Sequence, residues 1–138
     1  MNQELICTLC PMGCHLQVEH DGRKITTVRG NECKRALRYA DKEVFHPERT
    51  VTTTVAIHGA SLPLLPVKTD APVPRDRCRE IVDRARAVVV EAPVAAGDVV
   101  LADVLGLGCS LVATRTVERG TAPTGEAAGA ARPSDGPR

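Results

Sequence analysis

The sequence predicts a small α+β protein in three parts: a four-cysteine metal lobe with a β-hairpin over residues 1–50, a compact α+β lobe over 51–118, and a disordered tail over 119–138. Three observations predict this division. Four of the six cysteines lie within the first 33 residues. In the middle of the chain, β-branched runs alternate with an amphipathic helical pattern. The last nineteen residues contain no large apolar side chain, so they cannot bury enough surface to become ordered.

The first lobe is predicted to open with a cysteine loop and to continue as a hairpin. Leu16 and Val18 alternate with polar neighbours, an Asp-Gly turn signal follows, and residues 24–29 form a second extended run. Between residues 32 and 44 the apolar side chains recur at helical spacing, and a His-Pro pair ends this pattern. Cys33 is therefore expected in the first turn of a helix.

The second lobe is predicted to combine short strands with one amphipathic helix. Residues 51–58 are rich in β-branched side chains and lead through a glycine turn into a proline-punctuated stretch, which indicates a hairpin and then an extended crossing. Residues 75–86 carry apolar side chains on one side and charged ones on the other, the pattern of a helix. Further strands are expected at 87–91, 98–101 and 110–117.

Composition excludes several classes of partner and location. One tyrosine, one phenylalanine and no tryptophan leave little aromatic surface for stacking bases, so a nucleic acid is not expected as a partner. Eighteen basic side chains nearly balance seventeen acidic ones, and neither sign forms a long run. The N-terminal residues do not resemble a secretory signal, and the apolar runs are far shorter than the roughly 20 residues of a membrane-spanning helix. We therefore expect a cytoplasmic protein without direct membrane insertion.

The strongest signal is the spacing of the first four cysteines. Cys7, Cys10 and Cys14 form a C-x2-C-x3-C motif, and Cys33 follows after eighteen intervening residues. Three thiolates in one short loop and a fourth from a distant position suit the corners of a cubane cluster, whose sulfurs can accept hydrogen bonds from the loop backbone. The spacing therefore predicts a [4Fe-4S] cluster held by these four residues.

Two other uses of the cysteines remain open. Four thiolates also make a tetrahedral Zn²⁺ site, although zinc ligands usually arrive as two separate pairs rather than as three and one. A thiol redox relay would need a cysteine that is exposed and has a low pKa. Disulfides are disfavoured because a reducing compartment keeps ordinary thiols reduced. Cys78 and Cys109 lie in predicted helix and strand patterns, where we expect small buried hydrophobic residues.

Two basic residues follow the last ligand directly. Lys34 and Arg35 could offset the negative charge of a thiolate-bound cluster, or they could be ordinary solvated helix charges. The sequence contains no convincing set of serine, histidine and acid, nor a pair of carboxylates suited to acid-base chemistry. A non-catalytic redox subunit of an oxidoreductase complex is therefore expected rather than a stand-alone enzyme.

The first fifty residues resemble the N-terminal iron-sulfur lobe of molybdopterin oxidoreductases such as formate dehydrogenase. The resemblance rests on Ile6 to Cys14, on Cys33-Lys34-Arg35, and on His46-Pro47-Glu48-Arg49. In that family the four matching cysteines hold a [4Fe-4S] cluster. The chain is too short for the domains that bind molybdopterin there, so the resemblance does not imply that cofactor.

A broader resemblance covers nearly everything up to residue 119. The chain is similar to short bacterial proteins of unknown function with an N-terminal CxxCxxxC motif, encoded beside anaerobic glycerol-3-phosphate dehydrogenase-like flavoproteins. The cysteine motif, Tyr39-Ala40, and the stretches at 65–69, 96–100 and 112–115 underlie this similarity. It implies an electron-transfer component that serves an FAD-dependent dehydrogenase and a second flavoprotein oxidoreductase. A zinc-bound adaptor that docks the same two flavoproteins is the alternative.

Overall fold

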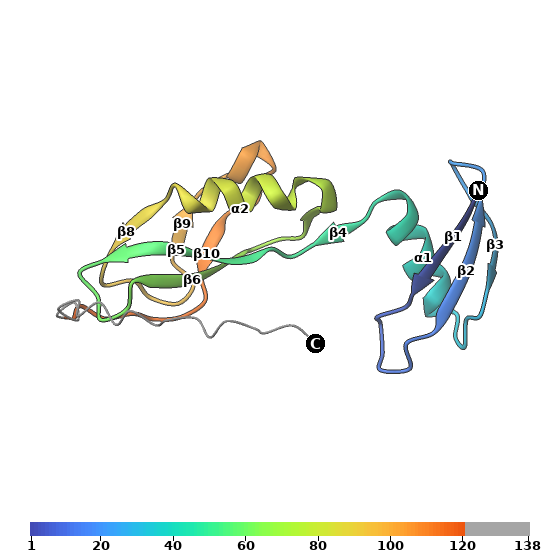
Figure 1. Ribbon diagram of the computed structural model, residues 1–138, viewed down its shortest axis with the longest axis horizontal. Coiled ribbons are helices and arrows are strands. Elements are labelled where there is room, and N and C mark those ends of the chain that lie inside the picture. The colour runs from blue at the N-terminus through green and yellow to red at the C-terminus, as the bar shows by residue number, and fades with distance from the viewer. Residues whose placement is uncertain (121–138) are drawn as a thin grey trace, which may run out of the picture.

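The computed structural model describes residues 1–120, and it places two larger sheets at opposite ends of an elongated molecule (Figure 1). The first sheet has three antiparallel strands in the order β1-β2-β3, and one helix packs against it. Its elements are β1 (Asn2–Ile6), β2 (His15–His20), β3 (Ile25–Arg29) and α1 (Arg35–Phe45).

The hairpin between β2 and β3 forms where the sequence predicts it. The Asp21 carboxylate accepts hydrogen bonds from the backbone N–H groups of Arg23 (2.8 Å) and Lys24 (2.7 Å), which fixes the turn and lowers the pKa of Asp21. Leu16 and Val18 are buried on one face of β2, as their alternation predicts. These two side chains pack against α1.

Two details of the first lobe differ from the prediction. Strand β1 was not predicted, because only Leu5 and Ile6 of its residues are apolar, and the strand is held instead by its ladder to β2. Tyr39 reinforces it from α1, since its hydroxyl donates to the Ile6 carbonyl at 2.9 Å. The predicted helix start is also wrong: α1 begins at Arg35, so Cys33 lies in the turn before the helix rather than in its first turn. The buried helical positions begin only at Ala36, which explains the later start.

A narrow junction connects the two lobes. Strand β4 (Glu48–Arg49) pairs with β7 (Val73–Pro74), and the Arg75 N–H donates to the Pro47 carbonyl at 2.9 Å. The Arg49 guanidinium binds both oxygens of the Glu43 carboxylate, one of them at 2.9 Å, and so ties β4 to α1. This hydrogen-bonded ion pair lowers the pKa of Glu43.

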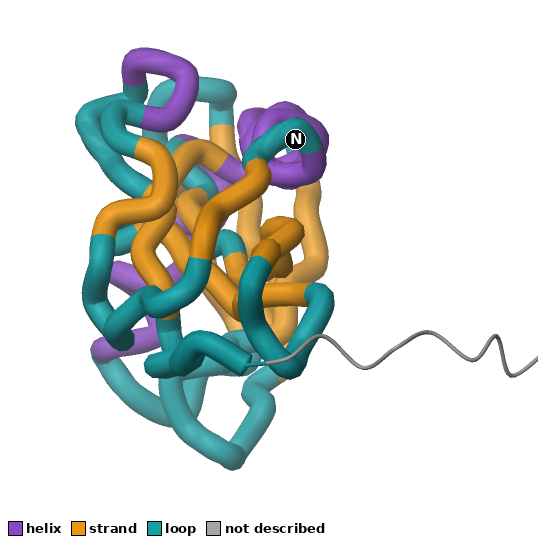
Figure 2. The backbone as a smooth tube through the Cα atoms, turned by 90° about the vertical axis from the view of Figure 1, so that its left-hand side faces the viewer, coloured by secondary structure: helices purple, strands orange, loops and turns teal. Residues whose placement is uncertain are grey.

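The second sheet has five strands in the order β8-β5-β6-β10-β9. In this sheet β5 and β8 pair in parallel, and the other neighbours pair antiparallel. The chain enters β8 from α2 (Cys78–Arg86), which packs against β5 and so allows the parallel pairing. The strands run through the middle of the lobe with loops around them (Figure 2). They are β5 (Thr52–His58), β6 (Leu64–Thr69), β8 (Val89–Glu91), β9 (Val99–Leu101) and β10 (Leu111–Ala113).

The predicted α+β class is confirmed for the second lobe, with shorter elements than expected. Residues 75–77, predicted as the start of the helix, form a 3-10 turn before α2. The expected extended crossing contains β6. The strand predicted at 110–117 is a β-strand only over 111–113. A 3-10 turn at 104–106 precedes β10, and Gly106 in this turn and Gly108 after it both have a positive φ.

The predicted tail begins too early. Arg119 and Gly120 still contact the second lobe: Arg119 Nε donates to the Ala92 carbonyl and Gly120 N–H donates to the Gly59 carbonyl, both at 3.0 Å. The remainder of the predicted tail lies outside the described residues.

Each lobe has its own hydrophobic cluster, and the two clusters share no residue. The first lobe buries only five hydrophobic side chains, which are Cys7, Leu16, Val18, Ala36 and Ala40. The second lobe buries sixteen, including Leu65, Ile81 and Leu111 at 0% exposure. The predicted boundary at residue 50 lies between the residues of the two clusters along the chain. Among residues 1–120, no helix is both long and apolar enough to cross a bilayer.

Candidate metal centre

The cysteine loop lies at one end of the first sheet (Figure 1). Strand β1 ends at Ile6 and β2 begins at His15, so residues 7–14 form the loop that joins them. The Cys7 N–H donates to the Cys14 carbonyl at 2.9 Å, which extends the ladder by one step and sets these two cysteines opposite each other. Cys10 lies in the middle of the same loop.

The chain returns to this end of the sheet with Cys33. Strand β3 runs antiparallel to β2, and Arg29 pairs with Gln17, so β3 leaves the sheet beside the start of β2. Gly30 makes this exit possible, because it has a φ of +81° and passes directly against the His15 carbonyl. The topology therefore brings all four cysteine segments to the same end of the lobe.

Cys33 has the most polar surroundings of the four cysteines. Backbone N–H groups of Ala36 and Arg35, at the start of α1, lower the pKa of the Cys33 thiol, and the Arg35 side chain adds a hydrogen bond that acts in the same direction. Each of these groups stabilises the thiolate form, which is the form that binds metals. Cys33 therefore has the electrostatic setting of a ligand.

The four sulfur atoms differ in how they are buried. Cys7 is buried in the hydrophobic cluster of the first lobe, Cys14 is partly buried against it, and Cys10 and Cys33 are half-exposed. Within residues 1–120, no three cysteine, histidine or acidic side chains converge closely enough to hold a metal ion. The backbone thus gathers four thiols, a donor set that suits iron-sulfur clusters and zinc, while the side chains do not meet at one point.

The two basic residues after Cys33 have different positions. Lys34 is exposed at the N-terminal end of α1 and makes no capping hydrogen bond through its side chain. Arg35 is also exposed, and its side chain is one of the groups that lower the pKa of the Cys33 thiol. Of the two, Arg35 is therefore the residue with an electrostatic effect on a candidate ligand.

The remaining cysteines belong to the second lobe. Cys109 is buried, as expected, and burial raises the pKa of its thiol. Cys78 packs against the core of the second lobe but is only partly buried, and its Sγ lies 3.7 Å from the Pro74 carbonyl, so the expectation of a buried hydrophobic residue holds for it in part. Neither residue joins the four at the end of the first sheet.

Gly30 should be far less tolerant of a side chain than another glycine of the same lobe. Both Gly30 and Gly13 have a positive φ, where any L-residue costs about 1 kcal/mol. A Cβ at Gly30 would lie 2.1 Å from the His15 carbonyl oxygen, whereas one at Gly13 meets no atom within 4 Å. We expect Gly30→Ala to lower the free energy of unfolding by roughly 2 kcal/mol or more and Gly13→Ala by about 1 kcal/mol, measured by urea denaturation. Equal losses would show that the β3 exit is not constrained as described.

Sequence reasoning missed a groove beside the cysteine loop. Its volume is about 660 Å³, and basic side chains of α1 and β4 contribute much of its lining. The signal was present, because Arg35, Arg38 and Lys42 recur at helical spacing and therefore share one side of α1. Arg49 joins them from β4, where its ion pair with Glu43 holds it against α1.

Fold and site together define a small α+β protein whose first lobe gathers four cysteines. The family model described as a protein of unknown function, DUF1667, matches residues 34–115, and the chain belongs to this family. The match begins directly after Cys33, so it does not include the four cysteines. A search of curated proteins gives no match. The NMR structure of Clostridium perfringens protein CPE0013 aligns with 55% of this chain and 91% of that chain, at 19% identity and a TM-score of 0.49.

Proposed function

We propose that this protein is a cytoplasmic iron-sulfur electron-transfer subunit of a flavoprotein dehydrogenase complex. Cys7, Cys10, Cys14 and Cys33 would hold one [4Fe-4S] cluster. The observation that supports this most is that the β1-β2-β3 topology brings four thiols to one end of a small sheet, three of them in a single loop. An exposed end suits a carrier, because electrons must reach and leave its cofactor from outside.

The residues around the candidate ligands suit a negatively charged group. When bound, a [4Fe-4S] cluster supplies one-electron transfer at a potential that its charge and hydrogen bonds adjust. The Arg35 guanidinium would oppose the negative charge of the thiolates, and the N–H groups at the start of α1 would act in the same direction. Lys34 is exposed nearby and would add a weaker, solvent-screened charge.

The proposed partners are an FAD-dependent dehydrogenase of the glycerol-3-phosphate dehydrogenase type and a second flavoprotein oxidoreductase. The support is the resemblance of the sequence to short proteins encoded beside such enzymes, together with the chemistry of the carrier. A reduced flavin can release its two electrons one at a time, and a one-electron carrier is needed to accept them. In this division the dehydrogenase binds the substrate and this chain only moves electrons.

A structural zinc site is the second candidate, and the small core of the first lobe favours it. Five buried side chains, two of them alanine and one cysteine, form a modest core for about fifty residues. Small domains with such cores often depend on a metal for folding. In this case the chain would be an adaptor that docks the two flavoproteins without carrying electrons.

Metal analysis of anaerobically purified protein separates the two functions. About four irons and four sulfides per chain, with an EPR signal after dithionite reduction, are expected for the carrier. One zinc and no iron would replace the carrier by the adaptor. Protein that binds neither metal after anaerobic reconstitution with iron and sulfide, or with zinc, would contradict both.

A further inference from the structure

The groove beside the cysteine loop has an excess of positive charge. It will be called the basic groove, and it is lined by Thr8 and Leu9 of the loop, Arg35, Arg38 and Lys42 of α1, and Arg49 of β4, among others. The basic groove has a volume of about 660 Å³.

Two of the four cations in the basic groove have no carboxylate partner within residues 1–120. Glu43 pairs with Arg49, and Glu48 pairs with Lys42 at 2.7 Å. Arg35 and Arg38 form no ion pair with any described residue, and both are exposed. The four basic and two acidic lining residues leave a net charge of two positive units, located at the end nearest the cysteine loop.

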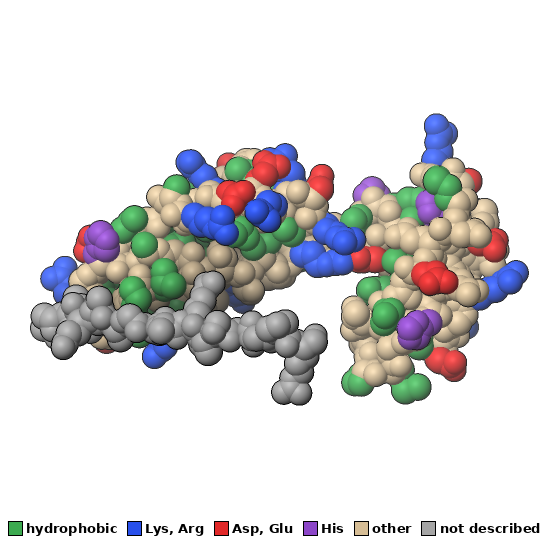
Figure 3. All heavy atoms as spheres, viewed as in Figure 1, with side chains coloured by type: hydrophobic (Ala, Val, Ile, Leu, Met, Phe, Trp, Pro, Cys, Tyr) green, Lys and Arg blue, Asp and Glu red, His purple; other side chains and the backbone are tan. Residues whose placement is uncertain are grey.

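An apolar patch borders this charged groove. Two large hydrophobic side chains of the cysteine loop form this patch: Leu9 is 49% exposed and also lines the basic groove, and Met12 is 73% exposed. Hydrophobic side chains are visible at the lower end of the first lobe, where the cysteine loop lies (Figure 3). Exposed apolar groups that cluster in this way often indicate a contact surface, and methionine and arginine are both enriched in such surfaces.

We propose that this face, the apolar patch with the basic groove beside it, docks an acidic surface of a partner protein. The inference rests on the proposed function, because it places the partner against the loop that would hold the cluster. Unpaired arginines at the rim would attract acidic side chains and raise the association rate, and the apolar patch would exclude water at the centre of the contact. The occupant is an acidic protein rather than a nucleotide, because the two arginines without a carboxylate partner stand on the exposed surface of α1 beside the hydrophobic side chains of the loop.

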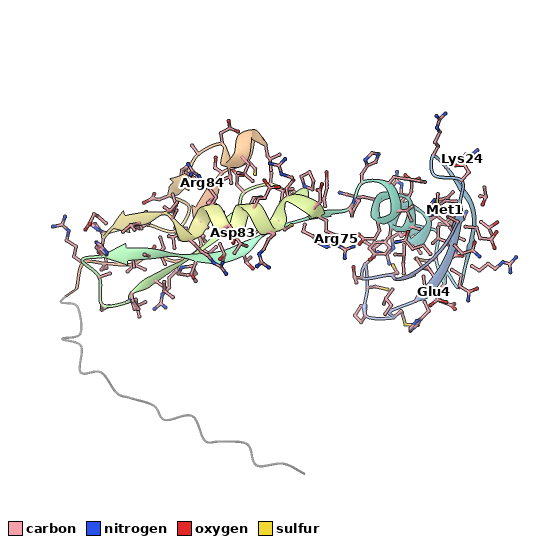
Figure 4. The ribbon with its side chains drawn as sticks, turned by 45° about the horizontal axis from the view of Figure 1, so that its top comes forward. Met1, Glu4, Lys24, Arg75, Asp83 and Arg84 are labelled. Atoms are coloured by element: carbon pink, nitrogen blue, oxygen red, sulfur yellow. The ribbon has the colours of Figure 1, made fainter. Side chains whose placement is uncertain are left out.

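Charge reversal at Arg38 tests this proposal, with Lys24 as the matched control. Both side chains are exposed cations of the first lobe, but Lys24 lies on the β2-β3 turn at the other end of the sheet (Figure 4). The probe is a fluorescent oligoglutamate peptide, and its binding is followed by anisotropy at low ionic strength. We expect Arg38→Glu to weaken binding roughly tenfold and to reduce its salt dependence, and Lys24→Glu to change binding by less than about twofold.

Three results would overturn the proposal. The first is an equal effect of the two substitutions on peptide binding, and the second is peptide binding that neither substitution changes. The third is that the peptide does not bind, while inorganic pyrophosphate binds tightly and Arg38→Glu removes that binding. The last result would make the groove a small-anion site. Binding is measured on the full chain with and without reconstituted metal, and metal content is determined for each variant. If the unmodified chain contains metal but does not bind the peptide, this inference alone is contradicted, whereas peptide binding as expected by a chain that binds no metal contradicts the proposed function alone.

Discussion

Replacing Cys10 with serine is expected to abolish metal binding while leaving the second lobe folded. Cys10 lies in the middle of the loop between β1 and β2, away from the ladder that Cys7 and Cys14 extend. A hydroxyl is a much poorer ligand than a thiolate for iron-sulfur clusters and for zinc, so loss of one ligand removes the site. Iron, sulfide and zinc content per chain, measured after anaerobic reconstitution, would fall from stoichiometric to near zero.

Cys78→Ser is the control for this experiment. Cys78 is a half-buried cysteine of α2 that packs against the core of the second lobe, away from the cysteine loop, so serine there should retain full metal content. Far-UV circular dichroism of both variants shows whether either has lost the second lobe. Stoichiometric metal in the Cys10→Ser protein would contradict the four-cysteine assignment, and loss of metal in both variants would indicate a site that is not confined to the first lobe.

The largest effect on stability is expected from Leu65→Ala. Leu65 is a fully buried residue of β6 among the apolar side chains of the second cluster. Its truncation removes apolar contacts and leaves a cavity, which costs about 2–5 kcal/mol in comparable cores. The free energy of unfolding of the second lobe, obtained by urea denaturation, should fall by that amount.

The neighbouring leucine is a matched control for this loss. Leu64 precedes Leu65 on the same strand and points to the opposite face of the sheet, where half of its surface is exposed. The same substitution at Leu64 should change stability by no more than about 0.5 kcal/mol. Similar losses at both positions would mean that the two faces of β6 are equally covered, against the burial described above.

Local sequence patterns predicted the helices and strands in which buried side chains recur at a regular spacing. The alternation around Leu16 and Val18 predicted β2, and the helical spacing after Cys33 predicted α1, because in both cases one face packs against the other element. Strand β1 has no such signal, since it is held mainly by backbone pairing with β2 and by a hydrogen bond from Tyr39. The start of α1 was misplaced by a few residues because the turn after β3 contains residues that are also compatible with a helix.

The candidate site was predictable only in part for a related reason. The spacing of the cysteines indicates a four-thiol site, but the topology that brings Cys33 back beside Cys14 depends on the exit of β3 at Gly30. The basic groove was predictable in part, because the spacing of Arg35, Arg38 and Lys42 places them on one side of a helix. The position of Arg49 depends on its ion pair with Glu43 and on the pairing of β4 with β7, and neither leaves a trace in local sequence periodicity.

The separation of the two hydrophobic clusters has a consequence for how this chain would respond to oxidative damage. The lobes share no buried residue and are joined mainly through β4, β7 and a few polar contacts. One lobe can therefore unfold while the other stays folded. Free energy gained from metal binding would then be confined to the first lobe. If the chain holds the proposed cluster, a molecule stripped of it by oxygen would keep the larger lobe folded, and only the first lobe would have to refold when the cluster is rebuilt.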